Sequence, residues 1–127
     1  AKPDHHLVVK GGYIVSAPGT PVCRQRPSVT VMFESLARYY RRSAIGVLLT
    51  GMGEDGAKGL KAIKDTGGYT IAEDESTAVV YGMPGAAVQM GAVLQSLPLR
   101  DIAPRIIELV DLAADYNESP AEVANGK

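Results

Sequence analysis

The sequence predicts an α/β fold with a doubly wound, mostly parallel sheet, flanking helices and an N-terminal β-hairpin. The nearly unbroken apolar run at 44–50 is typical of a strand buried on both faces of a parallel sheet. An amphipathic segment at 57–66 and a β-prone run at 69–73 complete a right-handed strand–helix–strand unit. Two adjacent glycines at 11–12, between two more β-prone runs, indicate the tight turn of a hairpin.

The N-terminal third is predicted to form this hairpin and one helix. The hairpin strands are expected at 7–9 and 13–15, on either side of the glycine pair. A helix is predicted over 27–42, because Pro27 suits a first turn and apolar side chains recur at helical spacing. Its inward-facing residues are expected to be Val29, Met32, Phe33, Leu36, Ala37 and Tyr40.

After the strand at 69–73, the chain is predicted to continue alternating between helix and strand. Pro84 begins and Gly91 ends one helix, and the segment 92–99 returns to the sheet. The last helix is predicted over 101–116, with Asp101 as its N-cap. Its core-facing residues are expected to be Ile102, Ile106, Leu109, Val110 and Ala113.

The composition predicts a cytoplasmic globular protein. Lys and Arg total 13 against 14 Asp and Glu, so neither a nucleic-acid partner nor membrane insertion is expected. No apolar run approaches the length of a membrane span, which is about 20 residues. Cys23 is the only cysteine, so no internal disulfide can form and a reducing compartment fits. Because the chain starts at Ala1 without a methionine, we expect it to be a piece of a longer protein.

The segment GMGEDG at 51–56 has the G-x-G-x-x-G spacing of a dinucleotide-binding turn. The acidic run 73–75 follows about 20 residues later, where a ribose-binding carboxylate would belong. However, Asp55 would repel a phosphate by about 4 kcal/mol at about 4 Å and an effective dielectric constant of about 20. The turn is therefore interpreted as a holder for an ionised carboxylate, stabilised by the helix that follows. A purely structural role for Asp55 as an N-cap stays open.

A carboxylate can orient a histidine that acts as the base toward a nucleophile, but the chain supplies no convincing partners. His5 and His6 are adjacent, so on a strand they point to opposite faces, and both are interpreted as surface residues. None of the seven serines lies in G-x-S-x-G or a similar elbow. Cys23 lies in a Pro-bounded loop, which does not favour a nucleophilic role. No complete triad, metal site or cofactor site is predicted within these residues.

From "RPSV" onward, the sequence closely resembles the catalytic domain of the bacterial chemotaxis protein-glutamate methylesterases. The segments that carry the resemblance are RPSVTVMFESLA, AIGVLLTGMGEDGAKGLKAIKDTGGYTIAEDESTAVVYGMPGAAVQMGAV and LPLRDIAPRIIEL. A weaker match over KPDHHLVVKGGYIVSAPG is similar to the family's hairpin, so the resemblance covers roughly residues 4–110.

The resemblance implies hydrolysis of γ-glutamyl methyl esters on chemoreceptor helices, and in many members deamidation of receptor glutamines, by a Ser–His–Asp triad. It implies that Asp55 is the triad carboxylate and that Met52, Gly51 and Gly53 line the site. The family's serine and histidine precede the hairpin, so we expect them upstream of this chain, together with a receiver domain. The chain alone is then expected to be inactive.

Residues 1–114 are accordingly expected to be the C-terminal portion of a methylesterase-type catalytic domain, followed by a disordered tail at 115–127. Two alternatives remain: a non-catalytic relative or fragment that binds a receptor or another protein, and a nucleotide-binding α/β domain. Half of a doubly wound sheet exposes a strand edge and apolar helix faces, so we expect the isolated chain to be unstable or to self-associate.

Overall fold

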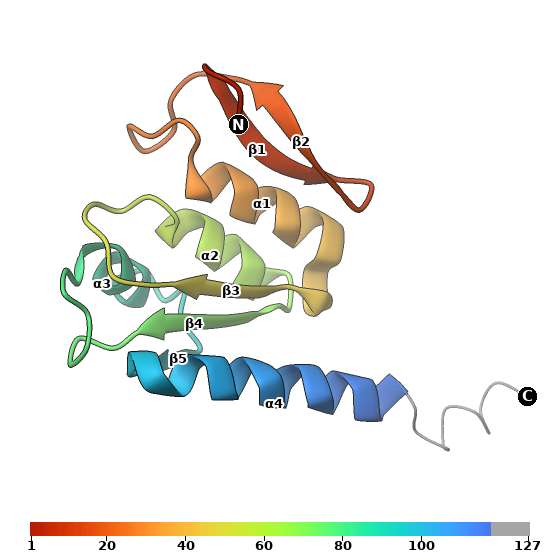
Figure 1. The fold of residues 1–127 in the computed structure, drawn as a ribbon, viewed down its shortest axis with the longest axis vertical. Coiled ribbons are helices and arrows are strands. Elements are labelled where there is room, and N and C mark those ends of the chain that lie inside the picture. Colours follow the sequence, from red (N-terminus) through yellow and green to blue (C-terminus); the bar gives the residue numbers. More distant parts are fainter. Residues whose placement is uncertain (118–127) are drawn as a thin grey trace, which may run out of the picture.

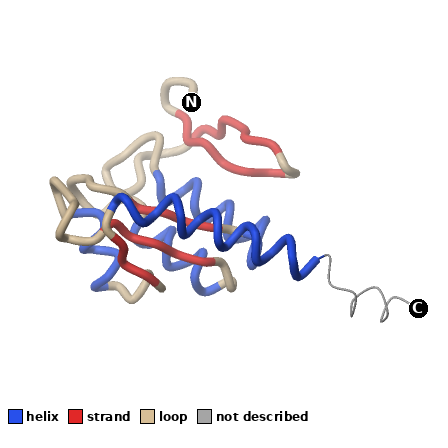
Figure 2. The backbone as a smooth tube through the Cα atoms, turned by 60° about the horizontal axis from the view of Figure 1, so that its bottom comes forward, coloured by secondary structure: helices blue, strands red, loops and turns tan. Residues whose placement is uncertain are grey.

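The computed structural model describes residues 1–117, and residues 118–127 lie outside the description. A parallel sheet of order β3-β4-β5 is formed by β3 (Ile45–Leu48), β4 (Tyr69–Glu73) and β5 (Gln95–Leu97). The helices are α1 (Val29–Tyr40), α2 (Ala57–Asp65), α3 (Gly82–Gln89) and α4 (Leu99–Asn117). Helices α2 and α3 cover one face of the sheet, with α1 packed against α2, and α4 runs along the other face, which confirms the predicted fold class (Figure 1, Figure 2).

The N-terminal hairpin is formed by β1 (His5–Lys10) and β2 (Tyr13–Pro18), which pair antiparallel. The two turn glycines have φ of 61° and 79°, so both adopt the left-handed conformation that a two-residue hairpin turn requires. The hairpin rests on α1, where the N–H of Val9 donates to Ser35 Oγ at 2.8 Å. The predicted hairpin is confirmed.

Helix α1 begins two residues later than predicted, because Ser28 is its N-cap and accepts a hydrogen bond from the N–H of Val31. Phe33 and Ala37 are buried on the predicted inward face. Tyr40 was also expected there but is exposed, because the helix ends at this residue and the 3-10 turn η1 (Arg41–Ser43) follows.

The predicted strand–helix–strand unit is formed by β3, α2 and β4. Strand β3 is shorter than predicted, and Gly46 packs so closely on α2 that a Cβ there would lie 2.6 Å from Leu60 Cδ1. Helix α2 ends at Asp65, and Gly67, two residues later, takes a φ of 92°. Strand β4 matches the predicted 69–73 run and is buried from its second residue onward, as a central strand should be.

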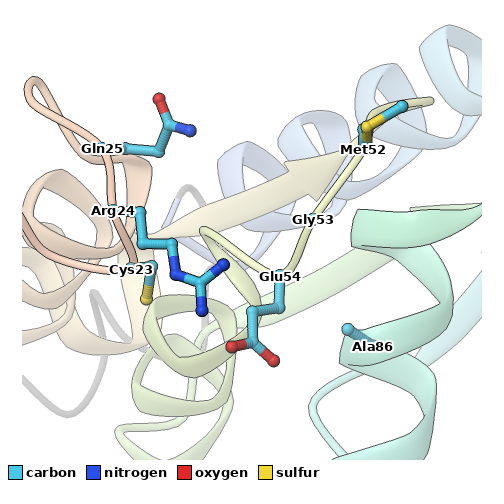
Figure 3. Close-up of a pocket in the computed structure, with 7 residues that line it drawn as sticks. All are labelled: Cys23, Arg24, Gln25, Met52, Gly53, Glu54 and Ala86. Atoms are coloured by element: carbon cyan, nitrogen blue, oxygen red, sulfur yellow. The ribbon is translucent and has the colours of Figure 1, made fainter.

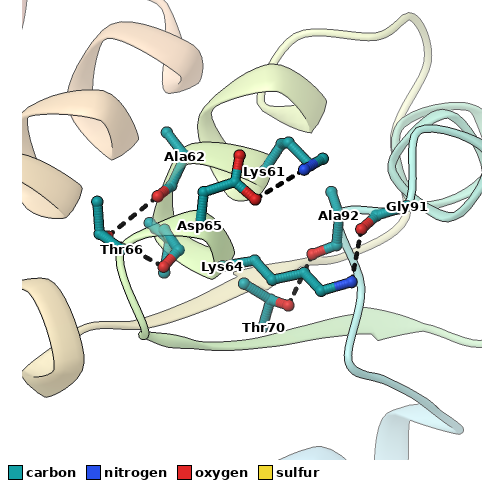
Figure 4. A network of polar contacts seen from close by, with 9 residues as sticks. Lys61, Ala62, Lys64, Asp65, Thr66, Thr70, Gly91 and Ala92 are labelled. Carbon is teal, nitrogen blue, oxygen red and sulfur yellow. Dashed lines mark hydrogen bonds and ion pairs between the residues drawn. The ribbon is translucent and has the colours of Figure 1, made fainter.

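Polar contacts tie the C-terminal end of α2 to the segment after α3 (Figure 4). Lys64 Nζ donates to Gly91 O at 2.7 Å, and Thr70 Oγ1 on β4 donates to Ala92 O at 2.7 Å. Helix α3 itself begins at Gly82, two residues before the Pro84 that was predicted to open it.

Helix α4 begins at Leu99, so Asp101 lies in its first turn and not at the N-cap. Of the residues predicted to face the core, Ile102 is buried, whereas Val110 and Ala113 are exposed. The reason lies in the sheet: in the described part of the chain β3 pairs only with β4, so no further strand or helix extends the layer beside α4. The helix continues to residue 117, beyond the predicted domain limit at 114, and the rest of the predicted tail lies outside the described residues.

Candidate active site

The GMGEDG turn leads from the carboxyl end of β3 into α2, and its glycines meet different geometric requirements. A Cβ at Gly51 would lie 2.5 Å from Met83 Sδ, so a larger residue there would require the Met83 side chain to move. Gly53 has a φ of 92°, and Gly56 has a φ of 96° with its Cβ position 2.8 Å from Leu48 Cδ2. The requirements at Gly53 and Gly56 explain these two glycines without a bound phosphate.

The carboxylate of Asp55 is bound by the first residues of α1. Oδ1 accepts from Ser28 Oγ at 2.7 Å and from the N–H of Thr30 at 3.2 Å. Oδ2 accepts from the N–H of Val29 at 2.8 Å. The residue is only 7% exposed, so these donors hold the carboxylate in a fixed position at the N-terminus of a helix.

Opposing effects act on the ionisation of Asp55. Burial raises the pKa of the carboxyl, but the hydrogen bonds from Ser28, Val29 and Thr30 together outweigh it, so the pKa lies below its ordinary value of 3.8. The positive end of the α1 dipole favours the same charged form. The sequence-based expectation that α2 supplies the stabilising helix was wrong: α2 is capped by Gly56, and the donors to Asp55 come from α1.

One acceptor position of Asp55 stays available. Within the described residues, Oδ2 accepts a single hydrogen bond, the one from Val29, whereas a carboxylate oxygen can accept two. A neutral imidazole N–H is a donor that suits such a position, since the acid of a hydrolytic triad binds its histidine in this way.

His6 is buried, at 4% exposed, so its interpretation as a surface residue was wrong. Its Nδ1 accepts from the N–H of Ser28 at 3.0 Å, which assigns the proton to Nε2, and Nε2–H donates to Thr20 O at 2.7 Å. Both ring nitrogens of His6 are thus hydrogen-bonded, and one of these bonds holds the backbone of Ser28, which donates to Asp55. His5 is half-buried, and its Nδ1 lies 2.7 Å from Pro3 O.

The contacts of the turn disfavour the dinucleotide interpretation. The N–H of Gly56, at the start of α2, is already donated to Thr30 Oγ1 at 2.8 Å. Glu73, the first acid considered for ribose binding, is 1% exposed and accepts from the N–H of Thr50 at 2.7 Å. Both groups are therefore engaged in hydrogen bonds within the domain.

A pocket of about 680 Å³ opens beside the turn (Figure 3). Met52, which is 83% exposed, lines it together with Gly53 and Glu54, whereas Gly51 is not among its lining residues. The remaining lining residues come from the loop before α1 and from α3: Cys23, Arg24, Gln25 and Ala86.

Two features are missing from residues 1–117. No group of three or more His, Cys, Asp or Glu side chains in this range is placed to hold a metal ion. Among the helices of the same range, none is both long enough and apolar enough to cross a bilayer. The candidate site therefore consists of the buried carboxylate, its donors and the adjacent pocket.

Comparison with protein families matches residues 1–106 to the family described as CheB methylesterase. The chain belongs to this family. This CheB-family chain is 55% identical over 108 residues to protein-glutamate methylesterase/protein-glutamine glutaminase 4 of Anaeromyxobacter dehalogenans, covering 83% of the chain and 30% of the relative. It is 50% identical over 109 residues to protein-glutamate methylesterase/protein-glutamine glutaminase 2 of Pseudomonas aeruginosa, covering 83% and 31%.

The crystal structure of the Thermotoga maritima CheB methylesterase catalytic domain aligns with a TM-score of 0.79 and 36% sequence identity. The alignment covers 86% of this CheB-family chain but 60% of the solved one. The chain also spans only about 30% of the length of the curated relatives. The resemblance predicted from the sequence is confirmed, and the match is to one part of a larger protein.

Sequence reasoning missed the residues that surround Asp55. A serine after Pro27 and before an apolar-periodic run is a typical N-cap, so the position of Ser28 could have been predicted. Nothing in the sequence indicates that its hydroxyl meets a carboxylate 27 residues away. The role of His6 likewise depends on how the hairpin is docked against α1.

Proposed function

We propose that this chain is the C-terminal part of the catalytic domain of a protein-glutamate methylesterase. The complete enzyme hydrolyses γ-glutamyl methyl esters on chemoreceptors and deamidates receptor glutamines at the same site. Asp55 is the carboxylate of its Ser–His–Asp triad. The serine and histidine belong to the part of the domain that precedes this chain, so the chain alone is inactive.

The buried carboxylate of Asp55 carries the proposal. A triad acid must stay ionised, keep one orientation and have an acceptor position free for an imidazole N–H. The three donors from Ser28, Val29 and Thr30 favour the charged form and fix the orientation, and Oδ2 keeps an unused acceptor position within the described residues. The names of the curated relatives support the reaction class.

In the proposed reaction, the histidine removes the proton of the serine hydroxyl as its oxygen attacks the γ-carbonyl of the substrate. Asp55 holds the imidazole in the tautomer whose Nδ1 carries the proton, and stabilises the imidazolium that forms. Methanol leaves from an ester, or ammonia from an amide, after the histidine returns the proton. Water then hydrolyses the acyl-enzyme and releases the glutamate carboxylate.

The wider assignment follows from the same family. The substrates are the cytoplasmic helices of methylated chemoreceptors, which places the enzyme in the cytoplasm. A receiver domain upstream of the catalytic domain controls access to the active site. Neither a cofactor nor a metal takes part, and no nucleic acid is bound.

The test measures methanol release from methylated receptors by the full-length protein that contains this chain. Asp55→Asn keeps the size of the side chain and removes its charge, so turnover should fall by about 10⁴-fold. Asp65→Asn alters an exposed carboxylate that pairs with Lys61 on α2, and as the matched control it should keep wild-type turnover. Near-normal turnover by Asp55→Asn would contradict the triad role. A wild-type protein that releases no methanol would contradict the methylesterase itself.

A further inference from the structure

The loop before α1 holds Arg24 in an unusual backbone conformation. Val22 and Gln25 exchange both backbone hydrogen bonds, at 3.0 and 2.9 Å, and so close a two-residue turn. The turn residues Cys23 and Arg24 have φ of 50° and 63°, a region in which glycine and asparagine are usual. Strain of this kind persists where the surroundings fix the conformation, and it is concentrated at binding sites.

The guanidinium group of Arg24 lines the pocket beside the GMGEDG turn and extends toward Glu54 (Figure 3). In the described part of the chain, the Arg24 side chain makes no hydrogen bond or ion pair. Arg26, two residues later, is instead committed to the fold, because it donates to Gly19 O at 3.2 Å and pairs with Asp4. The planar group of Arg24 therefore presents its donors to whatever enters the pocket, and a carboxylate matches that geometry.

The pocket carries opposite charges on its two sides. Arg24 comes from the loop before α1, and Glu54 immediately precedes Asp55 in the turn. No ion pair joins Arg24 to Glu54, so neither neutralises the other by direct contact. An anionic group entering the pocket is attracted to the Arg24 side and repelled from the Glu54 side, which gives a bound chain a preferred orientation.

We propose that Arg24 is a specificity-determining residue, which binds a carboxylate of the polypeptide substrate close to the ester that is cleaved. The inference rests on the methylesterase function proposed above. The ester itself is uncharged, so the carboxylate that Arg24 binds belongs to an acidic residue flanking the methylated glutamate. Arg24 thereby selects acidic segments, while Asp55 serves the chemistry.

The test uses the full-length protein and two helical peptides with one γ-glutamyl methyl ester each, flanked by glutamates in one and by glutamines in the other. In Arg24→Gln, the KM for the glutamate-flanked peptide should rise about fivefold with kcat unchanged, since one charge-assisted contact is lost. The KM for the glutamine-flanked peptide should stay the same. Glu54→Gln should lower the KM for the glutamate-flanked peptide, because it removes the repulsive charge. Added salt should shrink both effects.

Arg42→Gln is the matched control, because it removes the same charge near the amino ends of β3 and β4, away from the pocket. It should change neither KM. Equal changes for both peptides in Arg24→Gln would overturn the inference, since they would indicate a structural role, and so would no change for either. If the wild-type protein hydrolyses neither peptide, the methylesterase proposal fails by itself. Binding of the same peptides, followed by fluorescence anisotropy, then decides the role of Arg24: equal Kd values for the two peptides in the wild type would overturn it.

Discussion

Replacing Ser28 with alanine removes one hydroxyl that serves both α1 and Asp55. The bond from Ser28 Oγ to Asp55 is 2.7 Å long, whereas the capping contact with the N–H of Val31 is 3.4 Å. A hydrogen bond to a charged group is worth about 1.5–3 kcal/mol. The longer capping contact adds about 0.5 kcal/mol, at the low end for an N-cap. We expect the Ser28→Ala catalytic domain to lose about 2–3.5 kcal/mol of unfolding free energy at neutral pH.

The same substitution should change the pH dependence of stability. Asp55 has a folded-state pKa below its ordinary value of 3.8, so its contribution is complete above that value and is lost as the pH falls through the folded-state pKa. Because the Ser28 hydroxyl favours the charged form, its removal raises the pKa of Asp55. The acid-induced loss of stability in Ser28→Ala should therefore be smaller than in the wild type and complete at a higher pH.

Denaturant unfolding of the full-length protein at several pH values measures both effects. Ser43→Ala removes a hydroxyl from an exposed serine in η1 and serves as the control. If Ser28→Ala differed from the control by less than about 0.5 kcal/mol, the ordinary range for surface substitutions, the hydrogen bond would not stabilise the domain. If stability fell with pH in the same way in Ser28→Ala and in the wild type, the explanation given for the lowered pKa of Asp55 would be refuted.

Two further predictions concern the packing of the domain. Gly46→Ala places a Cβ 2.6 Å from Leu60 Cδ1 and 2.9 Å from Ile63 Cδ1. It should therefore destabilise the full-length protein by about 1–3 kcal/mol in denaturant unfolding. Wild-type stability in this variant would contradict the tight contact between β3 and α2. The isolated chain exposes Val110 and Leu112 on α4 and leaves one edge of β3 unpaired, so it should self-associate or melt without a sharp transition. A sharply melting monomer in analytical ultracentrifugation and calorimetry would show that these surfaces need no partner.

The sheet and its helices could be predicted because local signals agreed with the global fold. The strand at 69–73 is apolar, β-prone and bounded by glycine, and it forms the central strand. The failures lie where tertiary context decides. The apolar spacing of 101–116 indicated the correct helix, but Val110 and Ala113 are exposed because the layer that would cover them is not supplied by residues 1–117.

That the turn holds an ionised carboxylate could be predicted from the sequence, whereas the contacts of that carboxylate could not. The negative charge of Asp55 within GMGEDG was sufficient to favour a held carboxylate over a phosphate turn. The supporting donors were not predictable, since Ser28 and Thr30 lie far away in the sequence and reach Asp55 only when α1 packs against α2. His6 was misinterpreted for the same reason: the residue pattern of a strand does not show which other element packs against it.

Proton NMR of the full-length protein tests the proposed contact between Asp55 and the histidine of the triad most directly. An imidazole Nδ1–H that donates to a buried carboxylate should give a low-field resonance that titrates with the histidine. We predict this resonance in the wild type and in Asp65→Asn, and its loss or strong upfield shift in Asp55→Asn. A resonance that stays in place in a folded Asp55→Asn variant would show that the imidazole proton is held by another group, and would contradict the triad role of Asp55.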